Sequence, residues 1–274
     1  MKNFIYILLP FYLVSCLNKS QPKQNLKSPD YYFALAKKYG SQQQGSEIQQ
    51  IYYDSVLYVD PNNANTWWEK STWEIKIGNY IKYFEYMNKA VELDPGAHLG
   101  WRGAVKLYYL HDYDGALKDF FDLKKLYPNA TSLAARGEDL DFLIGSAYWQ
   151  KNDFEEAIKY FNKSISENKN GEEWADVYTF VYLGICYNET GEKDSAKIQF
   201  EKALKYYKQC VDAYYYLSKI YLEEGNKVVA LNHINNAIDY ADKGFIKQDS
   251  YRDVLGQIYY SDLTDLRNSI RSDK

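Results

Sequence analysis

Cysteine and histidine, which commonly act as nucleophiles, general bases and metal ligands, are scarce in this 274-residue sequence. Cysteine and histidine occur three times each. The six residues are Cys16, Cys186, Cys210, His98, His111 and His233. Their separations match neither a zinc-ligand spacing nor a disulfide framework, so we expect no metal site and no cofactor. Cys186 is expected to pack as a small buried apolar side chain.

Two further catalytic motifs are absent from the sequence. Gly145-Ser146 has no glycine two residues beyond the serine, so it is not a nucleophile elbow. No glycine-rich phosphate loop occurs. The net charge of −4 and the lack of a basic stripe argue against nucleic-acid binding. We therefore expect a protein that is not an enzyme and that acts by binding.

The first sixteen residues combine a positive start, an apolar run and small residues at the end of the run. The run over residues 4–14 has the length of a signal-peptide core and is too short to cross a bilayer as a helix. It ends in Leu13-Val14-Ser15-Cys16, which resembles the bacterial lipobox. The resemblance implies that residues 1–15 are a lipoprotein signal peptide and that Cys16 becomes the acylated N-terminus.

A polar segment without periodicity follows the cysteine. Residues 16–28 are predicted to form the lipidated cysteine and a flexible tether, which extends to ~40 Å. Two or more acyl chains hold a protein on a membrane almost irreversibly. Leu17, where an inner-membrane lipoprotein usually has Asp, favours the outer membrane. The expected location is therefore the cell envelope, with the chain lipid-anchored to the outer membrane of a Gram-negative bacterium.

From about residue 29 the sequence repeats with a period of 34 residues. The clearest copy contains Leu183-Gly184, Gly191 and Ala196, and the next contains Leu217-Ser218, Gly225 and Ala230. An earlier copy contains Gly145 and Ala157. Large residues three or four apart mark a helix face, small residues allow two helices to cross closely, and glycine supplies the turn. The pattern predicts a series of helical hairpins.

This pattern resembles the tetratricopeptide-repeat (TPR) family, which also has a proline late in each unit. Pro61, Pro95 and Pro128 occupy that position in the first half of the chain. The resemblance implies an all-α fold, a right-handed α-α superhelix (solenoid) of about six helical hairpins over residues 29–244. The units are placed near 29–62, 64–97, 98–130, 138–171, 177–210 and 211–244.

Residues 245–274 are predicted to form a capping helix and a polar tail. Tyr251, Val254, Leu255, Ile258 and Tyr259 make one more apolar stripe at helical spacing. A solenoid needs a terminal element to cover its last apolar face, and this stripe suits that role.

In TPR proteins the first helix of each unit lines a concave groove, and the resemblance implies a partner-binding face there. The candidate groove residues are Trp68, Thr72, Arg102, Lys106, Tyr109, Phe142, Trp149, Tyr178, Asn188, Tyr215 and Lys219. Trp, Tyr and Arg dominate the energetics of many interfaces. Arg102 and Lys106 lie one helical turn apart and are expected to hold an anion. Packing against neighbouring helices is the alternative role for each candidate.

The sequence thus predicts a non-catalytic lipoprotein that is anchored in the membrane through its N-terminus and binds a partner peptide or domain. Two alternatives remain open. One is a permanent subunit of an outer-membrane assembly or secretion complex. The other is a lipoprotein that captures glycans or peptides on its aromatic side chains. An adaptor for chaperone tails is excluded, because the paired asparagines of that clamp are missing next to Arg102 and Lys106.

Overall fold

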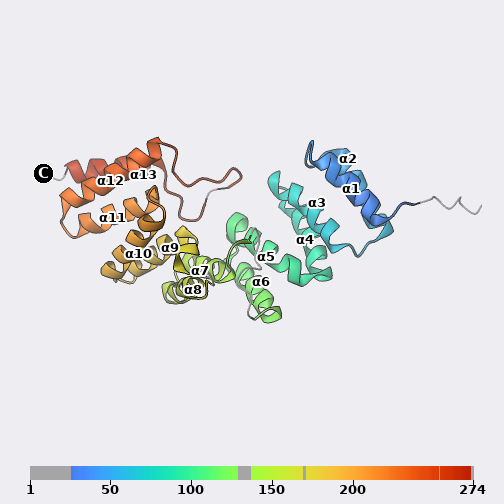
Figure 1. The fold of residues 1–274 in the computed structure, drawn as a ribbon, viewed down its shortest axis with the longest axis horizontal. Coiled ribbons are helices and arrows are strands. Elements are labelled where there is room, and N and C mark those ends of the chain that lie inside the picture. The colour runs from blue at the N-terminus through green and yellow to red at the C-terminus, as the bar shows by residue number, and fades with distance from the viewer. Residues whose placement is uncertain (1–25, 129–136, 169–170, 253, 273–274) are drawn as a thin grey trace, which may run out of the picture.

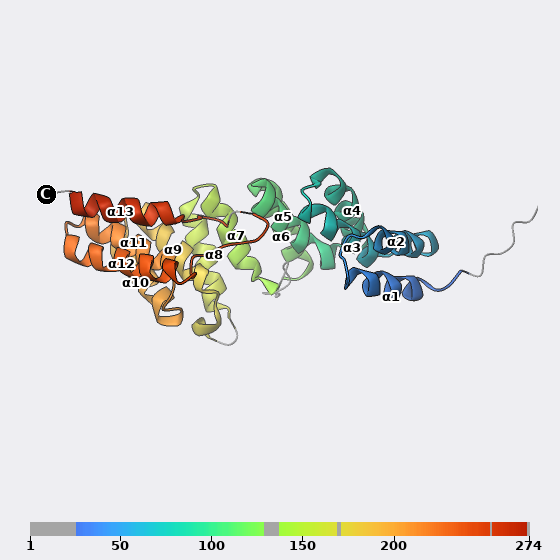
Figure 2. The same cartoon turned by 90° about the horizontal axis from the view of Figure 1, so that it is seen from above.

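The structure is a computed structural model that describes residues 26–128, 137–168, 171–252 and 254–272. Within these ranges the regular elements are all helices, and they stack into an arc that runs from α1 to α13 (Figures 1 and 2). The predicted all-α solenoid of helical hairpins is confirmed. The predicted signal peptide and the lipidation site Cys16 lie outside the described residues. Among the described helices, none is both long and apolar enough to cross a membrane.

The chain forms its hairpins from consecutive helices. They pair α1 (Pro29–Gly40) with α2 (Glu47–Val59), α3 (Ala64–Lys76) with α4 (Tyr80–Leu93), α5 (Pro95–Val105) with α6 (Tyr113–Leu126), α7 (Leu140–Gln150) with α8 (Phe154–Ser166), α9 (Val177–Glu189) with α10 (Lys193–Tyr206), and α11 (Val211–Glu223) with α12 (Lys227–Asp242). A short 3-10 turn, η3 (Glu172–Trp174), precedes α9, and α13 (Tyr260–Ser272) ends the described chain.

Most of these helices begin at a short polar side chain that caps a backbone N–H. Asn63 accepts from the N–H of Thr66 at 3.0 Å, and Asp94 accepts from the N–H of Ala97 at 3.0 Å. Such caps satisfy donors that have no partner inside the helix. The boundaries of the helices therefore follow from local sequence.

Small residues let the two helices of a hairpin cross closely. A Cβ atom at Gly145 would lie 2.8 Å from the ring of Phe161, and one at Gly184 would lie 2.8 Å from the ring of Phe200. Both rings are fully buried. The predicted role of the two glycines is confirmed.

The turns between the helices also follow the prediction. Gly191 and Gly225 have φ angles of 85° and 78°, in the left-handed region that favours glycine. Ser218 is fully buried, and its hydroxyl donates to the carbonyl of Ala230 at 2.8 Å. This bond joins α11 to α12. It also gives the buried hydroxyl of Ser218 an acceptor, at a position where the close crossing of the helices requires a small side chain.

The third hairpin departs from regular α-helix. Helix α5 continues as a π-helical turn, η1 (Lys106–Leu110), which ends at His111 with a φ angle of 54°. A π turn inserts extra backbone into a helix and is often found at functional sites. Here it carries Tyr108 and Tyr109 to the inner side of the arc, where both line a cavity.

The prediction for the C-terminal cap was wrong in its residues. The stripe from Tyr251 to Tyr259 is not helical, and the terminal helix is α13, which packs against α12 and α11. Leu263 and Ile270 supply its buried side chains. Gly256 interrupts the stripe with a φ angle of 65°, and the stripe packs on the inner side of the arc instead.

Replacement of Gly184 by valine tests the close crossing. We expect Gly184→Val to reduce the free energy of unfolding by about 1–3 kcal/mol, because the valine meets the buried ring of Phe200. Urea denaturation followed by circular dichroism measures the change. The double variant Gly184→Val/Phe200→Leu is expected to lose less than the sum of the two single variants. Strictly additive losses would contradict the proposed contact.

Candidate partner-binding groove

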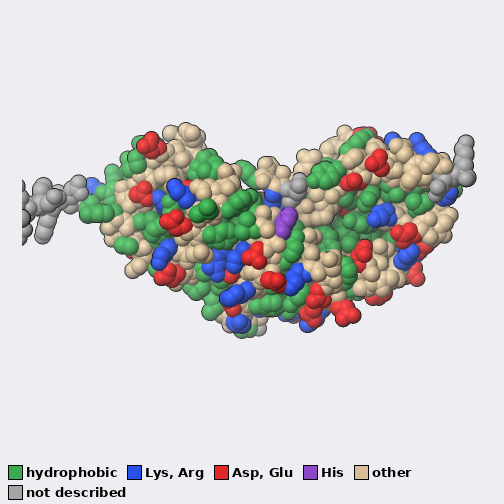
Figure 3. Space-filling model, turned by 180° about the vertical axis from the view of Figure 1, so that it is seen from behind, with side chains coloured by type: hydrophobic (Ala, Val, Ile, Leu, Met, Phe, Trp, Pro, Cys, Tyr) green, Lys and Arg blue, Asp and Glu red, His purple; other side chains and the backbone are tan. Residues whose placement is uncertain are grey.

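The inner side of the arc holds two neighbouring hollows. The first, here called the N-terminal cavity, lies among α3, α4, α5 and η1. The second, the strap pocket, lies against α7 and α9 and is shared with the segment between α12 and α13. We call that segment, residues 245–252 and 254–258, the strap. Figure 3 shows the upper edge of the molecule hollowed between its two ends.

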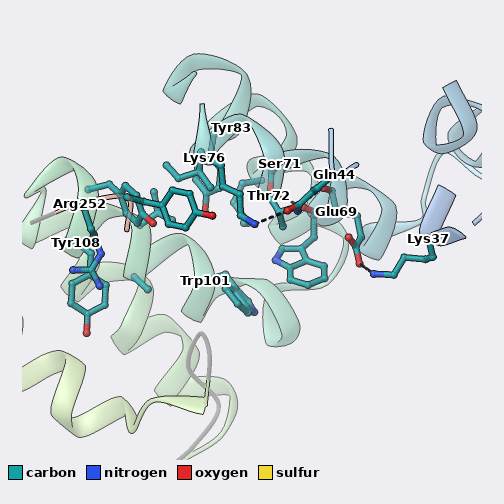
Figure 4. A pocket seen from close by; sticks show the side chains of 17 residues that line it. Lys37, Gln44, Glu69, Ser71, Thr72, Lys76, Tyr83, Trp101, Tyr108 and Arg252 are labelled. Atoms are coloured by element: carbon teal, nitrogen blue, oxygen red, sulfur yellow. Dashed lines mark hydrogen bonds and ion pairs between the residues drawn. The ribbon is translucent and has the colours of Figure 1, made fainter. Parts of the chain in front are cut away.

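The N-terminal cavity has a volume of about 410 Å³. Its lining is mostly aromatic and aliphatic, as is usual for ligand pockets. The apolar lining comprises Trp68, Ile75, Tyr83, Met87, Trp101, Ala104, Val105, Tyr108, Tyr109 and Tyr251 (Figure 4).

Trp68 and Tyr83 bring two buried donors to this lining. The Trp68 ring contacts those of Trp101 and His98, with centroids 5.4 and 6.1 Å away. Within the described part of the chain, neither Trp68 Nε1 nor the Tyr83 hydroxyl has a hydrogen-bond partner, and both atoms are buried. Burial also raises the pKa of Tyr83 and lowers the pKa of His98, so both side chains are neutral at pH 7. Buried donors without acceptors are rare and costly in folded proteins.

The rim of the cavity is polar and internally paired. Lys37 of α1 lies 2.7 Å from Glu69 of α3, and Lys76 Nζ donates to Gln44 Oε1 at 2.6 Å (Figure 4). Gln44 Nε2 donates in turn to the hydroxyl of Thr72 at 3.4 Å. These bonds tie α1 and its following loop to α3, so they hold one wall of the cavity in place.

The structure brings three of the predicted groove residues together. Trp68 and Thr72 of α3 and Tyr109 of η1 all line the N-terminal cavity. Their binding of a partner remains a prediction.

Arg102 and Lys106 were expected to hold an anion from a partner, and the structure gives them one from their own hairpin. Arg102 makes a two-pronged bond to Asp119 of α6, at 2.9 Å from Nε and 2.7 Å from Nη2. Lys106 Nζ lies 2.8 Å from the same carboxylate, whose side chain is only 1% exposed. A buried carboxylate requires such compensation. Neither cation lines the N-terminal cavity.

Phe142 and Trp149 were also expected to meet a partner, and instead they are buried within the chain. Phe142 is 6% and Trp149 8% exposed, and both stack on Tyr182, with centroids 5.9 and 4.3 Å away. A Cβ atom at Gly256 of the strap would lie 2.7 Å from Trp149. The expected occupant of this part of the groove is replaced by a segment of the same chain.

Tyr178 lines the strap pocket and contacts a carboxylate and an ammonium group. Its hydroxyl lies 3.2 Å from Asp212 Oδ2, and Lys247 Nζ of the strap lies 3.3 Å from its ring centroid. Burial lowers the pKa of Lys247 and raises the pKa of Asp212, while each charge counters the shift of the other. The predicted groove residue therefore contacts a cation supplied by the strap.

The other three candidates lie apart from both hollows. Asn188, Tyr215 and Lys219 line neither the N-terminal cavity nor the strap pocket. Lys219 Nζ lies 5.7 Å from the ring centroids of Tyr215 and Tyr216. The structure does not gather these residues into one site with Trp68.

Several residues of the two hollows were not predicted from the sequence. Tyr83 and Met87 come from α4, a second helix, which the family resemblance assigns to packing. Lys247 and Arg252 come from the strap, whose apolar stripe suggested a helix. Tyr182 alone had a usable signal, because it lies four residues after Tyr178 on the same helix face.

Two family models match the chain, and both are described as tetratricopeptide repeat. They cover residues 142–170 and 183–244, so the repeats predicted there are confirmed. Protein CTR9 homolog of Arabidopsis thaliana is 22% identical over 231 residues, which are 70% of this chain and 21% of that protein.

Solved structures share the fold. The yeast Tom70 structure has a TM-score of 0.57 at 17% identity and covers 90% of this chain and 48% of its own. Pseudomonas aeruginosa PilF has a TM-score of 0.59 at 16% identity and covers 80% of this chain and 97% of its own. The chain thus spans about a fifth of the CTR9 homolog and about half of Tom70.

Removal of the buried carboxylate tests the role assigned to Arg102 and Lys106. We expect Asp119→Ala to lower the free energy of unfolding by about 2–4 kcal/mol, because two cations then lack their counter-charge. The matched control is Asp122→Ala on the same helix, which removes surface pairs with Lys118 and Lys125 and should cost less than about 1 kcal/mol. Equal losses in chemical denaturation would refute the assignment.

The two buried cysteines are expected to be unreactive in the folded chain. Burial raises the pKa of Cys186 and of Cys210 to about 12, so both are neutral thiols at pH 8. Only thiolates react readily. Alkylation by iodoacetamide, followed by mass spectrometry of each cysteine, should be at least ~100-fold slower in the native chain than in urea. Comparable rates would show that these thiols are accessible.

Proposed function

We propose that this chain, which contains tetratricopeptide repeats, is a non-catalytic scaffold of the cell envelope that binds a partner protein in its N-terminal cavity. The observation that carries the proposal is the cavity of about 410 Å³ with a lining that is mostly aromatic and aliphatic. A partner that supplies an apolar side chain would fill this volume.

The aromatic lining suits a binding site for protein rather than a catalytic one. Trp68, Trp101 and Tyr109 offer broad, stiff surfaces from two successive hairpins. Aromatic side chains of this kind contribute most to many protein interfaces. Among the described residues, no cluster of His, Cys, Asp or Glu is placed to hold a metal ion. The paired rim would surround the bound segment with polar groups.

The proposed location rests on the N-terminal sequence. The apolar run and Leu13-Val14-Ser15-Cys16 support a lipid anchor on Cys16, and Leu17 favours the outer membrane of a Gram-negative bacterium. Residues 17–28 would then tether the solenoid to the membrane surface. In this arrangement the anchor sets where the scaffold works, and the cavity selects its partner.

A second candidate function is the capture of a small ligand such as a glycan. The volume of about 410 Å³ and the neighbouring rings of Trp68 and Trp101 favour it. Sugars bind by stacking on such rings. This candidate differs from the first in that no partner protein is required.

Crosslinking in the native host, followed by mass spectrometry, tests the proposal. We expect one or two envelope proteins to crosslink to the wild-type chain and to be lost with Trp68→Ala/Tyr109→Ala. Each truncated aromatic anchor should cost about 1–4 kcal/mol of binding, or at least tenfold in affinity for the pair. The matched control, Trp174→Ala/Tyr58→Ala, removes the same residue types from exposed positions outside the cavity and should retain the partners.

The other outcomes separate the alternatives. Partners that persist with the cavity variant would refute the cavity as the binding site. Partners that stay bound through high salt in fixed stoichiometry would indicate a permanent subunit of a larger envelope complex. The absence of any protein, together with a thermal shift caused by oligosaccharides, would favour the second candidate.

A further inference from the structure

The strap takes a course that the position of α13 does not require. It leaves α12, runs along the inner side of the arc toward α5, and returns to α13 (Figures 1 and 2). Helix α13 packs directly against α12, so a short turn would connect them. The neighbouring helices α11 and α12 are joined by residues 224–226, whereas residues 243–259 join α12 to α13. Connections longer than about 12–15 residues without secondary structure are uncommon in compact domains, and those that pack against the fold are often functional.

One basic side chain of the strap lies in an aromatic and acidic site. Lys247 Nζ lies 3.3 Å from the ring centroid of Tyr178 and donates to the Tyr182 hydroxyl at 2.9 Å. The Tyr182 hydroxyl donates in turn to the carbonyl of Leu255 at 3.0 Å. Asp212 supplies a buried negative charge beside the ammonium. Such a site selects a cation by ring attraction and charge together.

A second basic side chain lies on the next pair of rings. The guanidinium carbon of Arg252 lies 4.0 Å from the ring centroid of Tyr108 and 5.7 Å from that of Tyr109. The Tyr108 hydroxyl donates to Glu138 at 3.3 Å, which adds negative charge to this position. Arg252 also lines the N-terminal cavity, so the strap forms part of the wall of that cavity.

Beyond Arg252 the strap inserts apolar side chains. Val254 and Leu255 are 8% and 6% exposed, and Gly256 passes over Trp149 so closely that a Cβ atom would lie 2.7 Å from the ring. Apart from the bond to the Leu255 carbonyl, these contacts with the solenoid are made by side chains. The site therefore recognises a chemical pattern of basic and apolar groups on an extended segment, which another chain can also present.

We propose that the groove of the C-terminal half, which includes the strap pocket, is a recognition site for an extended segment carrying Lys or Arg next to apolar residues. The strap fills this groove as an intrachain ligand, and a partner with the same chemistry displaces it. This rests on the proposed function as a binding scaffold and adds a second site with a stated partner chemistry. The covalent link gives the strap a high local concentration, so a competing segment binds only when it matches the same cationic and apolar contacts. Displacement uncovers Trp149 and the tyrosines and opens one side of the N-terminal cavity.

A matched pair of glycine variants tests the inference on the purified full chain. Gly256 and Gly244 both have positive φ angles, but a Cβ atom meets Trp149 at Gly256 and meets nothing within 4 Å at Gly244. Gly256→Ala should therefore release the strap, and Gly244→Ala should not. The probe is a fluorescent synthetic peptide of residues 244–258, whose binding is followed by anisotropy.

We expect the peptide to bind Gly256→Ala at least tenfold more tightly than it binds the wild type or Gly244→Ala. A peptide in which Lys247 and Arg252 are replaced by glutamine should lose at least tenfold of that affinity. Trypsin should cut after Lys247 and Arg252 faster in Gly256→Ala than in Gly244→Ala, and faster in the wild type when excess peptide is added. Equal peptide affinity for all three chains, or equal binding of the neutral peptide, would overturn the inference.

A second variant covers the case in which Gly256→Ala does not fold, as judged by circular dichroism. Lys247→Gln/Arg252→Gln removes the two cationic contacts of the strap and changes no residue of the solenoid helices. The control Lys208→Gln/Arg271→Gln makes the same change of charge at two exposed positions. Only the first pair should increase peptide binding. No partner protein enters these measurements, so their failure leaves the crosslinking result at Trp68 intact, and loss of the crosslinks leaves the peptide result intact.

Discussion

In three of the hairpins a glycine on the first helix lies against the ring of a phenylalanine on the second. A Cβ atom on the glycine would lie 2.5 Å from the ring in the pair Gly103 and Phe120, and 2.8 Å in the pairs Gly145 and Phe161 and Gly184 and Phe200. The missing side chain sets the distance between the two helices, and the ring fills the space that remains. Because each hairpin stacks on the next, the distance between the helices of one hairpin affects the position of its neighbour. The repeated spacing therefore determines where the inner side chains lie along the arc.

Buried carboxylates add a second constraint to the stacking. Asp119 on α6 is held by Arg102 of α5 and Lys106 of η1, and Asp141 on α7 is held by Lys124 of α6 and Lys163 of α8. A buried charge tolerates little displacement of its partners. These cations therefore orient neighbouring helices, and none of the four lines the N-terminal cavity. The N-terminal cavity, with Trp68 and Trp101, is one result of that arrangement.

The strap connects the two halves of the proposed function. It occupies the C-terminal part of the groove through Lys247 and Arg252, and Tyr251 and Arg252 also border the N-terminal cavity. A segment that replaced the strap would thus change the shape of the cavity next to it. Two contacts on one scaffold, one aromatic and one cationic, would allow the protein to distinguish between partners that share only one of these features.

The sequence alone determined the helical hairpins, the close crossings at Gly145 and Gly184, and the turn at Gly191, because each depends on residues within one 34-residue unit. It also selected Trp68 and Tyr109 as inner residues. Only the tertiary structure decided that Arg102 and Lys106 turn toward Asp119 and that the strap fills the groove. The bonds from Tyr182 to Lys247 and Leu255 span 65 and 73 residues. Such contacts depend on how the whole solenoid curves, so they cannot be predicted from the pattern within one repeat.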